Sequence, residues 1–134
     1  MMHLVEVRMT RNVVTVRPAE TLAAAASKMQ AGPFRRLPVV DADQLVGIVS
    51  EFDLRRYVDS LDSTLVKTAM TRHPITVMPS ETLDHAATLM RQHKVGALPV
   101  MHLGKLVGIV AARDLMMPEP QPLPEWDPRN RRQS

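Results

Sequence analysis

The sequence LVGIVSEFDL at residues 45–54 indicates how the chain is organised, because almost the same sequence returns as LVGIVAARDL at residues 106–115. The two stretches differ only in their middle, where Ser-Glu-Phe at 50–52 stands against Ala-Ala-Arg at 111–113. A repeat at a fixed spacing is the mark of a duplicated structural unit. The identical residues on either side therefore predict that the same local structure forms twice. The three differing residues between them predict that the two copies differ in function.

The duplication extends well beyond this stretch. A shift of 61 residues aligns residues 9–54 with residues 70–115 without a gap, and 22 of the 46 aligned positions are identical. The identities include a Met-Thr-Arg triplet at the start, a Thr-Val-x-Pro segment, a Glu-Thr-Leu triplet and a Leu-Pro-Val triplet. We therefore treat the chain as two copies of one unit.

Each copy predicts the order β-α-β-β-α. In the first copy, a short β-branched run at 13–16 indicates a strand that Pro18 ends. An apolar stripe at Leu22, Ala25, Ala26 and Met29 has the i, i+3, i+4, i+7 spacing of an amphipathic helix. The following segments then predict a strand at 37–40, a turn at 41–43, a strand at 45–49 and a helix over about 51–58.

The second copy repeats this pattern, with a strand at 75–77, an amphipathic helix whose apolar stripe is Leu83, Ala86, Ala87 and Met90, and a last helix from about Ala112. Thr21 and Thr82 are the expected N-caps of the two long helices, and Ser80 is a rival in the second copy.

One such copy is too small to bury a stable core. We therefore expect an α+β fold in which two copies pack with pseudo-twofold symmetry. The predicted domains are 1–62 and 63–117, and a proline-rich, disordered tail is expected over 118–134.

Composition excludes several classes of protein. The sequence has no apolar run of the roughly 20 residues that a membrane span needs, and its N-terminus does not resemble a signal peptide. It has no cysteine, which excludes disulfides and thiolate metal sites and fits a cytoplasmic protein. The net charge is +3 without a long basic run, and only four aromatic residues are present, so nucleic-acid binding is not expected.

The sequence also offers little for catalysis. The five histidines are scattered, and only His85 and His93 share a predicted helix, without a carboxylate to complete a metal site. The chain has no glycine-rich phosphate loop and no serine in a nucleophile elbow. We therefore expect neither an enzyme nor a metal protein.

The junction that follows the strand at 45–49 is the most informative candidate site. Gly47 permits close approach of another backbone or of a ligand. Ser50 and Asp53 have the spacing of a capping box at the start of a helix. The same hydroxyl and carboxylate, next to free N–H groups of a helix N-terminus, could bind the ribose and phosphate of a nucleotide. The residues alone leave both readings open.

At these residues the sequence resembles a tandem pair of CBS domains, a Bateman module. The resemblance covers residues 5–117 and rests on the ordered set Met-Thr, Thr-Val-x-Pro, Thr-Leu-x-x-Ala-x-x-x-Met, Leu-Pro-Val and Leu-Val-Gly-Ile-Val-x-x-x-Asp-Leu, which occurs twice. It implies a regulatory protein, not an enzyme, that binds an adenosine-containing ligand such as AMP, ADP, ATP or S-adenosylmethionine and forms a homodimer. The regulated partner protein is not identified by the sequence.

The family motif Gly-hydrophobic-x-Ser/Thr-x-x-Asp matches Gly47, Ser50 and Asp53 in full. By this resemblance, Ser50 and Asp53 contact ribose or phosphate, and Arg36 is either a phosphate partner or a solvated surface residue. The implied ligand-binding residues of the first copy are Thr15, Val16, Arg36, Leu37, Pro38, Gly47, Ser50 and Asp53.

In the second copy Ala111 replaces the hydroxyl residue of the motif, which predicts a weaker, altered or empty site. The implied ligand-binding residues there are Thr76, Val77, Ala97, Leu98, Pro99, Gly108 and Asp114. The alternative function is a structural dimerisation module whose two ligand sites have degenerated.

Overall fold

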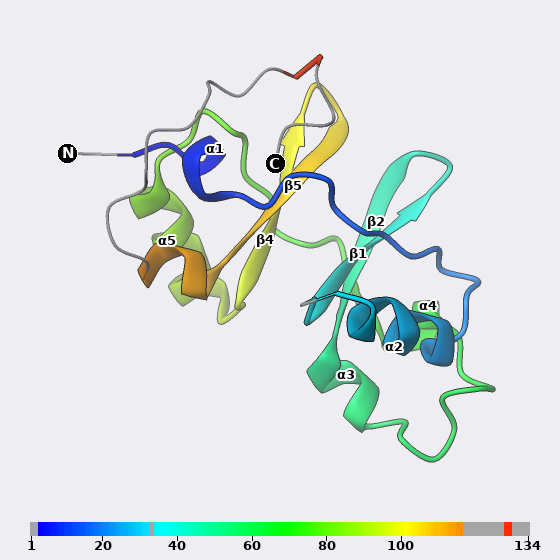
Figure 1. Cartoon of the computed structure of the whole chain (residues 1–134). Helices are drawn as coiled ribbons and strands as arrows, with labels where there is room; N and C mark the ends of the chain where they lie inside the picture. Colours follow the sequence, from blue (N-terminus) through cyan, green and yellow to red (C-terminus); the bar gives the residue numbers. More distant parts are fainter. Residues whose placement is uncertain (1–2, 33, 117–127, 130–134) are drawn as a thin grey trace. The chain divides into compact units, whose positions relative to one another are not determined.

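The computed structural model of the chain describes residues 3–32, 34–116 and 128–129 (Figure 1). The chain divides into two compact units. We call Val14–Pro74 the first-repeat unit, and Met1–Val13 together with Ile75–Ser134 the second-repeat unit. In chain order the elements are α1 (Val5–Arg8), α2 (Leu22–Gln30), β1 (Arg36–Asp41), β2 (Gln44–Ser50), α3 (Glu51–Arg55), α4 (Val66–Ala69), β3 (Thr71–Arg72), α5 (Leu83–His93), β4 (Ala97–His102), β5 (Lys105–Ala111) and the 3-10 helix η1 (Ala112–Met116). This mixture of helices and small sheets confirms the α+β class.

Both predicted hairpins are present (Figure 1). Strands β1 and β2 pair antiparallel around a two-residue loop, Ala42–Asp43, and β4 and β5 pair in the same way around Leu103–Gly104. All four loop residues have positive φ angles, between 49° and 78°. Two consecutive positive φ values are typical of the type I′ turn, whose twist matches that of the strands it joins.

The long helices begin where the threonines predict. Thr21 Oγ1 accepts a hydrogen bond from the Ala24 amide at 3.1 Å, and Thr82 Oγ1 accepts one from the His85 amide at the same distance. Thr82 and not Ser80 is therefore the N-cap of α5.

The predicted strands at 13–16 and 75–77 are wrong as strands, since each is reduced to a single parallel bridge, Val16 with Val39 and Val77 with Val100. The Val16 amide donates to the Pro38 carbonyl, and the Val40 amide donates to the Val16 carbonyl. Pairing stops there because the next donors along the ladder would be Pro38 and Pro18, and Pro99 and Pro79 in the second copy, and proline has no amide to donate.

The start of each repeat completes the other repeat's unit. Strand β3, at the start of the second repeat, pairs with β2 of the first. Thr10, at the start of the first repeat, exchanges backbone hydrogen bonds of 2.8 and 3.0 Å with Ile109 of β5. The short helices α4 and α1, which the sequence did not predict, belong to the same two segments. The division at 62 and 63 thus remains a prediction about the repeats, while the compact units exchange these segments.

Each unit has its own apolar core. In the first-repeat unit the buried side chains come from α2, β1, β2, α3, α4 and the Val16 segment. In the second-repeat unit they come from α1, α5, β4, β5 and the Val77 segment. The described residues include no buried polar or charged side chain, so burial of aliphatic surface stabilises both units.

The last predicted helix of each copy is shorter than expected. Helix α3 ends at Arg55 instead of Val58, because the chain turns back so that the Leu61 carbonyl can accept from the Ala23 amide of α2. Its counterpart is the 3-10 helix η1. The predicted tail at 118–134 lies outside the described residues apart from 128–129.

Candidate functional site

The junction between β2 and α3 contains the expected capping box. Ser50 Oγ accepts from the Asp53 amide at 3.1 Å, and Asp53 Oδ2 accepts from the Ser50 amide at 2.8 Å. Both residues are half-buried. The reciprocal bonds hold the hydroxyl and the carboxylate in one geometry, and they leave the Ser50 hydroxyl proton and Asp53 Oδ1 for other partners.

The junction offers fewer free amides than the sequence predicted. The Glu51 amide donates to the Arg35 carbonyl at 2.8 Å, and the Asp53 amide is taken by Ser50. Helix α3 is also only five residues long, which limits its dipole. Side-chain groups, and not a cluster of helix N–H groups, are therefore the chemistry that this junction presents.

The other predicted residues of the first copy lie in the same unit as Ser50. Arg36 is half-buried on β1, directly opposite Ser50 in the antiparallel register. The Val16 and Leu37 side chains are 1% and 0% exposed within the core, so these two residues could contribute only backbone atoms to a ligand. Pro38 is buried, and its carbonyl accepts from the Val16 amide at 3.1 Å.

Gly47 serves packing. A Cβ atom at this position would lie 2.7 Å from Met70 Sδ and 2.8 Å from the Thr71 carbonyl oxygen. Gly108 meets Met9 and Thr10 in the same way, at 2.9 Å for each atom. These glycines therefore allow the exchanged Met-Thr segment to approach the hairpin, which explains why the glycine and the Met-Thr pair recur together in both copies.

The second copy retains only part of the junction. Asp114 Oδ2 accepts from the Ala111 amide at 2.7 Å, but Ala111 has no hydroxyl to return the bond. The Ala112 amide donates to the Gly96 carbonyl at 2.8 Å, so this amide is engaged as well. Arg8 of α1 adds a feature without a counterpart in the first copy: its Nη1 donates to the Asp114 carbonyl at 3.2 Å.

The remaining predicted residues of the second copy follow the pattern of the first. The Val77 amide donates to the Pro99 carbonyl at 3.1 Å. Ala97 pairs with Ala111 in the hairpin register. The Val77 and Leu98 side chains are buried in the second core, while Thr76, next to Val77, is exposed.

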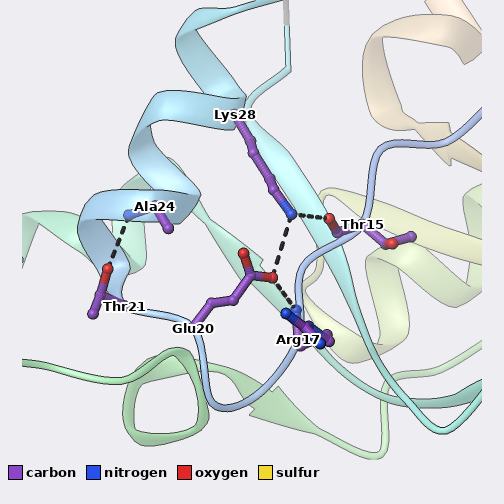
Figure 2. A network of polar contacts seen from close by, with 6 residues as sticks. All are labelled: Thr15, Arg17, Glu20, Thr21, Ala24 and Lys28. Atoms are coloured by element: carbon purple, nitrogen blue, oxygen red, sulfur yellow. Dashed lines mark hydrogen bonds and ion pairs between the residues drawn. The ribbon is translucent and has the colours of Figure 1, made fainter.

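The sequence did not predict a polar network that lies beside the Thr15–Val16 segment (Figure 2). Lys28 Nζ donates to the Thr15 carbonyl at 2.8 Å and lies 3.3 Å from Glu20 Oε2, which also accepts from the Arg17 amide at 2.7 Å. Partial burial acts to raise the pKa of Glu20, but the hydrogen bond from Arg17 and the hydrogen bond and charge of Lys28 together hold it below its ordinary value. No local motif marks this network, because Lys28 is 13 residues from Thr15.

The described part of the chain offers neither a metal site nor a membrane-spanning helix. Over residues 3–32, 34–116 and 128–129 no group of three or more histidine or carboxylate side chains is arranged to hold a metal ion. Among the same residues, none of the helices has both the length and the hydrophobicity that a transmembrane span requires.

Comparison with known proteins places this geometry in a family. The model of the CBS domain matches residues 4–60 and 66–117. The inosine-5'-monophosphate dehydrogenase of Korarchaeum cryptofilum is 37% identical over 122 residues, which are 90% of this chain but only 25% of that enzyme. The CBS domain-containing protein YhcV of Bacillus subtilis is 36% identical over 110 residues, which are 80% of this chain and 79% of YhcV.

A solved structure agrees with these matches. The crystal structure of the CBS domain pair of protein MJ0100, in complex with 5-methylthioadenosine and S-adenosyl-L-methionine, superposes with a TM-score of 0.80 at 26% identity. The match covers 87% of this chain and 94% of that one. With both repeats matched by the family model and the fold shared with a solved pair, the chain belongs to the CBS-domain family as a tandem pair of CBS domains.

Proposed function

We propose that the chain is a regulatory module that binds an adenosine-containing ligand at the β2–α3 junction of the first-repeat unit. Binding would alter how the module engages a regulated protein, and we expect the module to act as a cytoplasmic homodimer. The observation that carries this proposal is the Ser50–Asp53 capping box, which holds a hydroxyl and a carboxylate oxygen in fixed positions at the end of a strand.

The chemistry of the junction suits a ribose. A carboxylate oxygen can accept from a ribose hydroxyl, and the Ser50 hydroxyl can donate to a ribose or phosphate oxygen. Arg36, opposite Ser50, is placed to add positive charge if the ligand carries phosphate. The adenosine-containing ligands of the MJ0100 pair support AMP, ADP, ATP and S-adenosylmethionine as the first compounds to test.

The second-repeat junction is proposed as the weaker site. It keeps the Asp114 carboxylate and has Arg8 beside it, but it lacks the hydroxyl that Ser50 supplies in the first copy. A lost hydrogen bond costs about 0.5–1.5 kcal/mol, and more when the partner is charged. We therefore expect one ligand to bind before a second, weaker one.

A structural dimerisation module is the competing function, and one observation favours it. Ser50 and Asp53 already satisfy two of each other's polar groups, as a purely structural cap would. In that case the serine and aspartate would matter only for the stability of α3.

Thermal unfolding with ligand separates the two functions. A ligand at 100 times its Kd stabilises a protein by about 2.7 kcal/mol, which should raise the Tm by roughly 10 °C for a chain of this size. We expect such a rise with at least one of AMP, ADP, ATP and S-adenosylmethionine. If all four leave the Tm unchanged at millimolar concentration, the dimerisation module replaces the ligand sensor as the better account.

A further inference from the structure

The polar network around Lys28 distinguishes the first copy from the second, although both copies have a threonine and a glutamate at the positions of Thr15 and Glu20 (Figure 2). In the first copy, Lys28 of α2 joins the Thr15 carbonyl to the Glu20 carboxylate. At the equivalent positions the second copy has Thr76, Glu81 and Leu89. Leu89 has no donor and packs against the second core, so this link cannot form there.

The two equivalent glutamates consequently have different partners. Both accept a hydrogen bond from the backbone amide three residues earlier, that of Arg17 for Glu20 and that of Met78 for Glu81. Glu81 then pairs at 3.1 Å with His85 Nε2, in the first turn of the helix α5 that follows it. Glu20 instead pairs with a lysine two turns along α2, which itself holds the Thr15 carbonyl.

The Lys28 link holds the Thr15–Val16 segment, which few other hydrogen bonds fix in place. Beside it, the Val16 amide donates to the Pro38 carbonyl at 3.1 Å and the Val40 amide donates to the Val16 carbonyl at 2.9 Å, and these two bonds form a single bridge. Neither bond of the bridge involves Thr15, the preceding residue. The Lys28 ammonium adds a hydrogen bond there, because it joins the Thr15 carbonyl to α2 through a charge-assisted bond.

We propose that Lys28 is a positioning residue for the first ligand site. By binding the Thr15 carbonyl and the Glu20 carboxylate together, it holds the Thr15–Val16 segment in the conformation that the ligand meets, and the second copy lacks this device. This inference rests on the proposed function, since it assigns Lys28 to the same site. It adds a second cause for unequal ligand binding by the two copies, independent of the Ser50 and Ala111 difference.

The test compares Lys28→Met, Lys28→Arg and Lys67→Met in the full-length protein. Lys28→Met removes the donor and keeps the length of the side chain, whereas Lys28→Arg keeps a cationic donor. Lys67→Met removes an equal charge from an exposed position of the same unit. Calorimetric titration with AMP, at a temperature where every variant is folded, gives the affinity. Amide hydrogen exchange of Val16 and Val40 without AMP gives the mobility of the segment.

We expect Lys28→Met to weaken AMP binding roughly tenfold, equivalent to about 1.4 kcal/mol, and to accelerate exchange at both amides. Lys28→Arg should restore most of the affinity, and Lys67→Met should change neither quantity. Unchanged AMP affinity or unchanged exchange in Lys28→Met would overturn the proposal, as would an equal loss of affinity in Lys67→Met. If the wild-type protein binds none of the adenosine compounds, the proposed function fails, and the exchange data alone still decide whether Lys28 holds the segment.

Discussion

Ser50→Ala should destabilise the first repeat, and Ala111→Ser should stabilise the second. Ser50→Ala removes the oxygen that accepts from the Asp53 amide at 3.1 Å, while the 2.8 Å bond from the Ser50 amide to Asp53 Oδ2 uses the backbone and can survive. The variant junction would then have the same single bond that Ala111 and Asp114 make at 2.7 Å in the second copy. Loss of such a cap costs about 1 kcal/mol, within a range of roughly 0.5–2 kcal/mol.

The reverse substitution provides the complementary expectation. Ala111→Ser supplies an acceptor for the Asp114 amide and completes a capping box whose other half is already present. We expect it to stabilise the protein by up to about 1 kcal/mol and to favour α-helical over 3-10 geometry in η1. The double variant should lie near the wild-type protein, because the two sites belong to different units and share no partner.

Urea unfolding followed by circular dichroism measures these effects. With a slope of about 1–3 kcal/mol per molar urea, a loss of 1 kcal/mol lowers the midpoint by roughly 0.3–1 M. Ser63→Ala is the matched control, since the Ser63 hydroxyl is exposed and makes only a long 3.4 Å bond to the Ser60 carbonyl. A midpoint for Ser50→Ala equal to that of Ser63→Ala would refute the assignment of Ser50 as a stabilising cap.

Three further outcomes follow from the structure. Gly47→Ala should destabilise the protein by roughly 1–3 kcal/mol, because its Cβ would meet the Thr71 carbonyl at 2.8 Å; an unchanged urea midpoint would show that β3 moves away freely. Glu20 has a lowered pKa, so its interactions stabilise the fold above its ordinary pKa of 4.5 and are lost as pH falls through the lower folded value. Glu20→Gln should therefore flatten the acid limb of the stability curve, and a limb identical to that of wild type would contradict the pairing. Replacing Ala42-Asp43 by Asn-Gly, which suits two positive φ angles, should raise the Tm by a few degrees; a lower Tm would contradict the assigned turn.

Much of the fold could be predicted because its signals are local. The hairpins, the long helices and the caps at Thr21 and Thr82 each follow from a few adjacent residues, and the structure confirms them. The short helices α1 and α4 could not be found in this way, since four residues make barely one turn and show no apolar period.

The exchange of the Met-Thr-Arg segments between the two repeats could not be predicted, for a different reason. The sequence marked the recurring Met-Thr-Arg triplet, but the partner of each triplet is a strand of the other repeat, and nothing local identifies it. The glycine in the recurring stretch was the available clue. Its requirement for close approach was recognised, but the approaching atoms, Met70 Sδ and the Thr71 carbonyl, became evident only from the fold.

Only part of the candidate site could be predicted from the sequence. The Ser50–Asp53 box follows from a three-residue spacing, and the structure confirms it. The predicted free amides at the junction were wrong in part, because the Glu51 amide finds a partner across the hairpin at Arg35. Sequence reasoning missed Lys28, since its contact with Thr15 depends on how α2 packs beside the Val16 bridge.

The proposed function requires that the first-repeat junction bind an adenosine-containing ligand through Asp53 and Ser50. The most direct measurement is calorimetric titration of AMP, ATP and S-adenosylmethionine into the wild-type protein, Asp53→Asn and Asp114→Asn. An asparagine oxygen can still accept from the Ser50 amide, so Asp53→Asn removes the charge while it keeps the cap. We expect saturable binding to the wild-type protein. Asp53→Asn should weaken that binding roughly tenfold or more, which is at least about 1.4 kcal/mol, and Asp114→Asn should weaken it less. Binding by Asp53→Asn that equals that of the wild-type protein, or no binding by the wild-type protein, would contradict the proposed function.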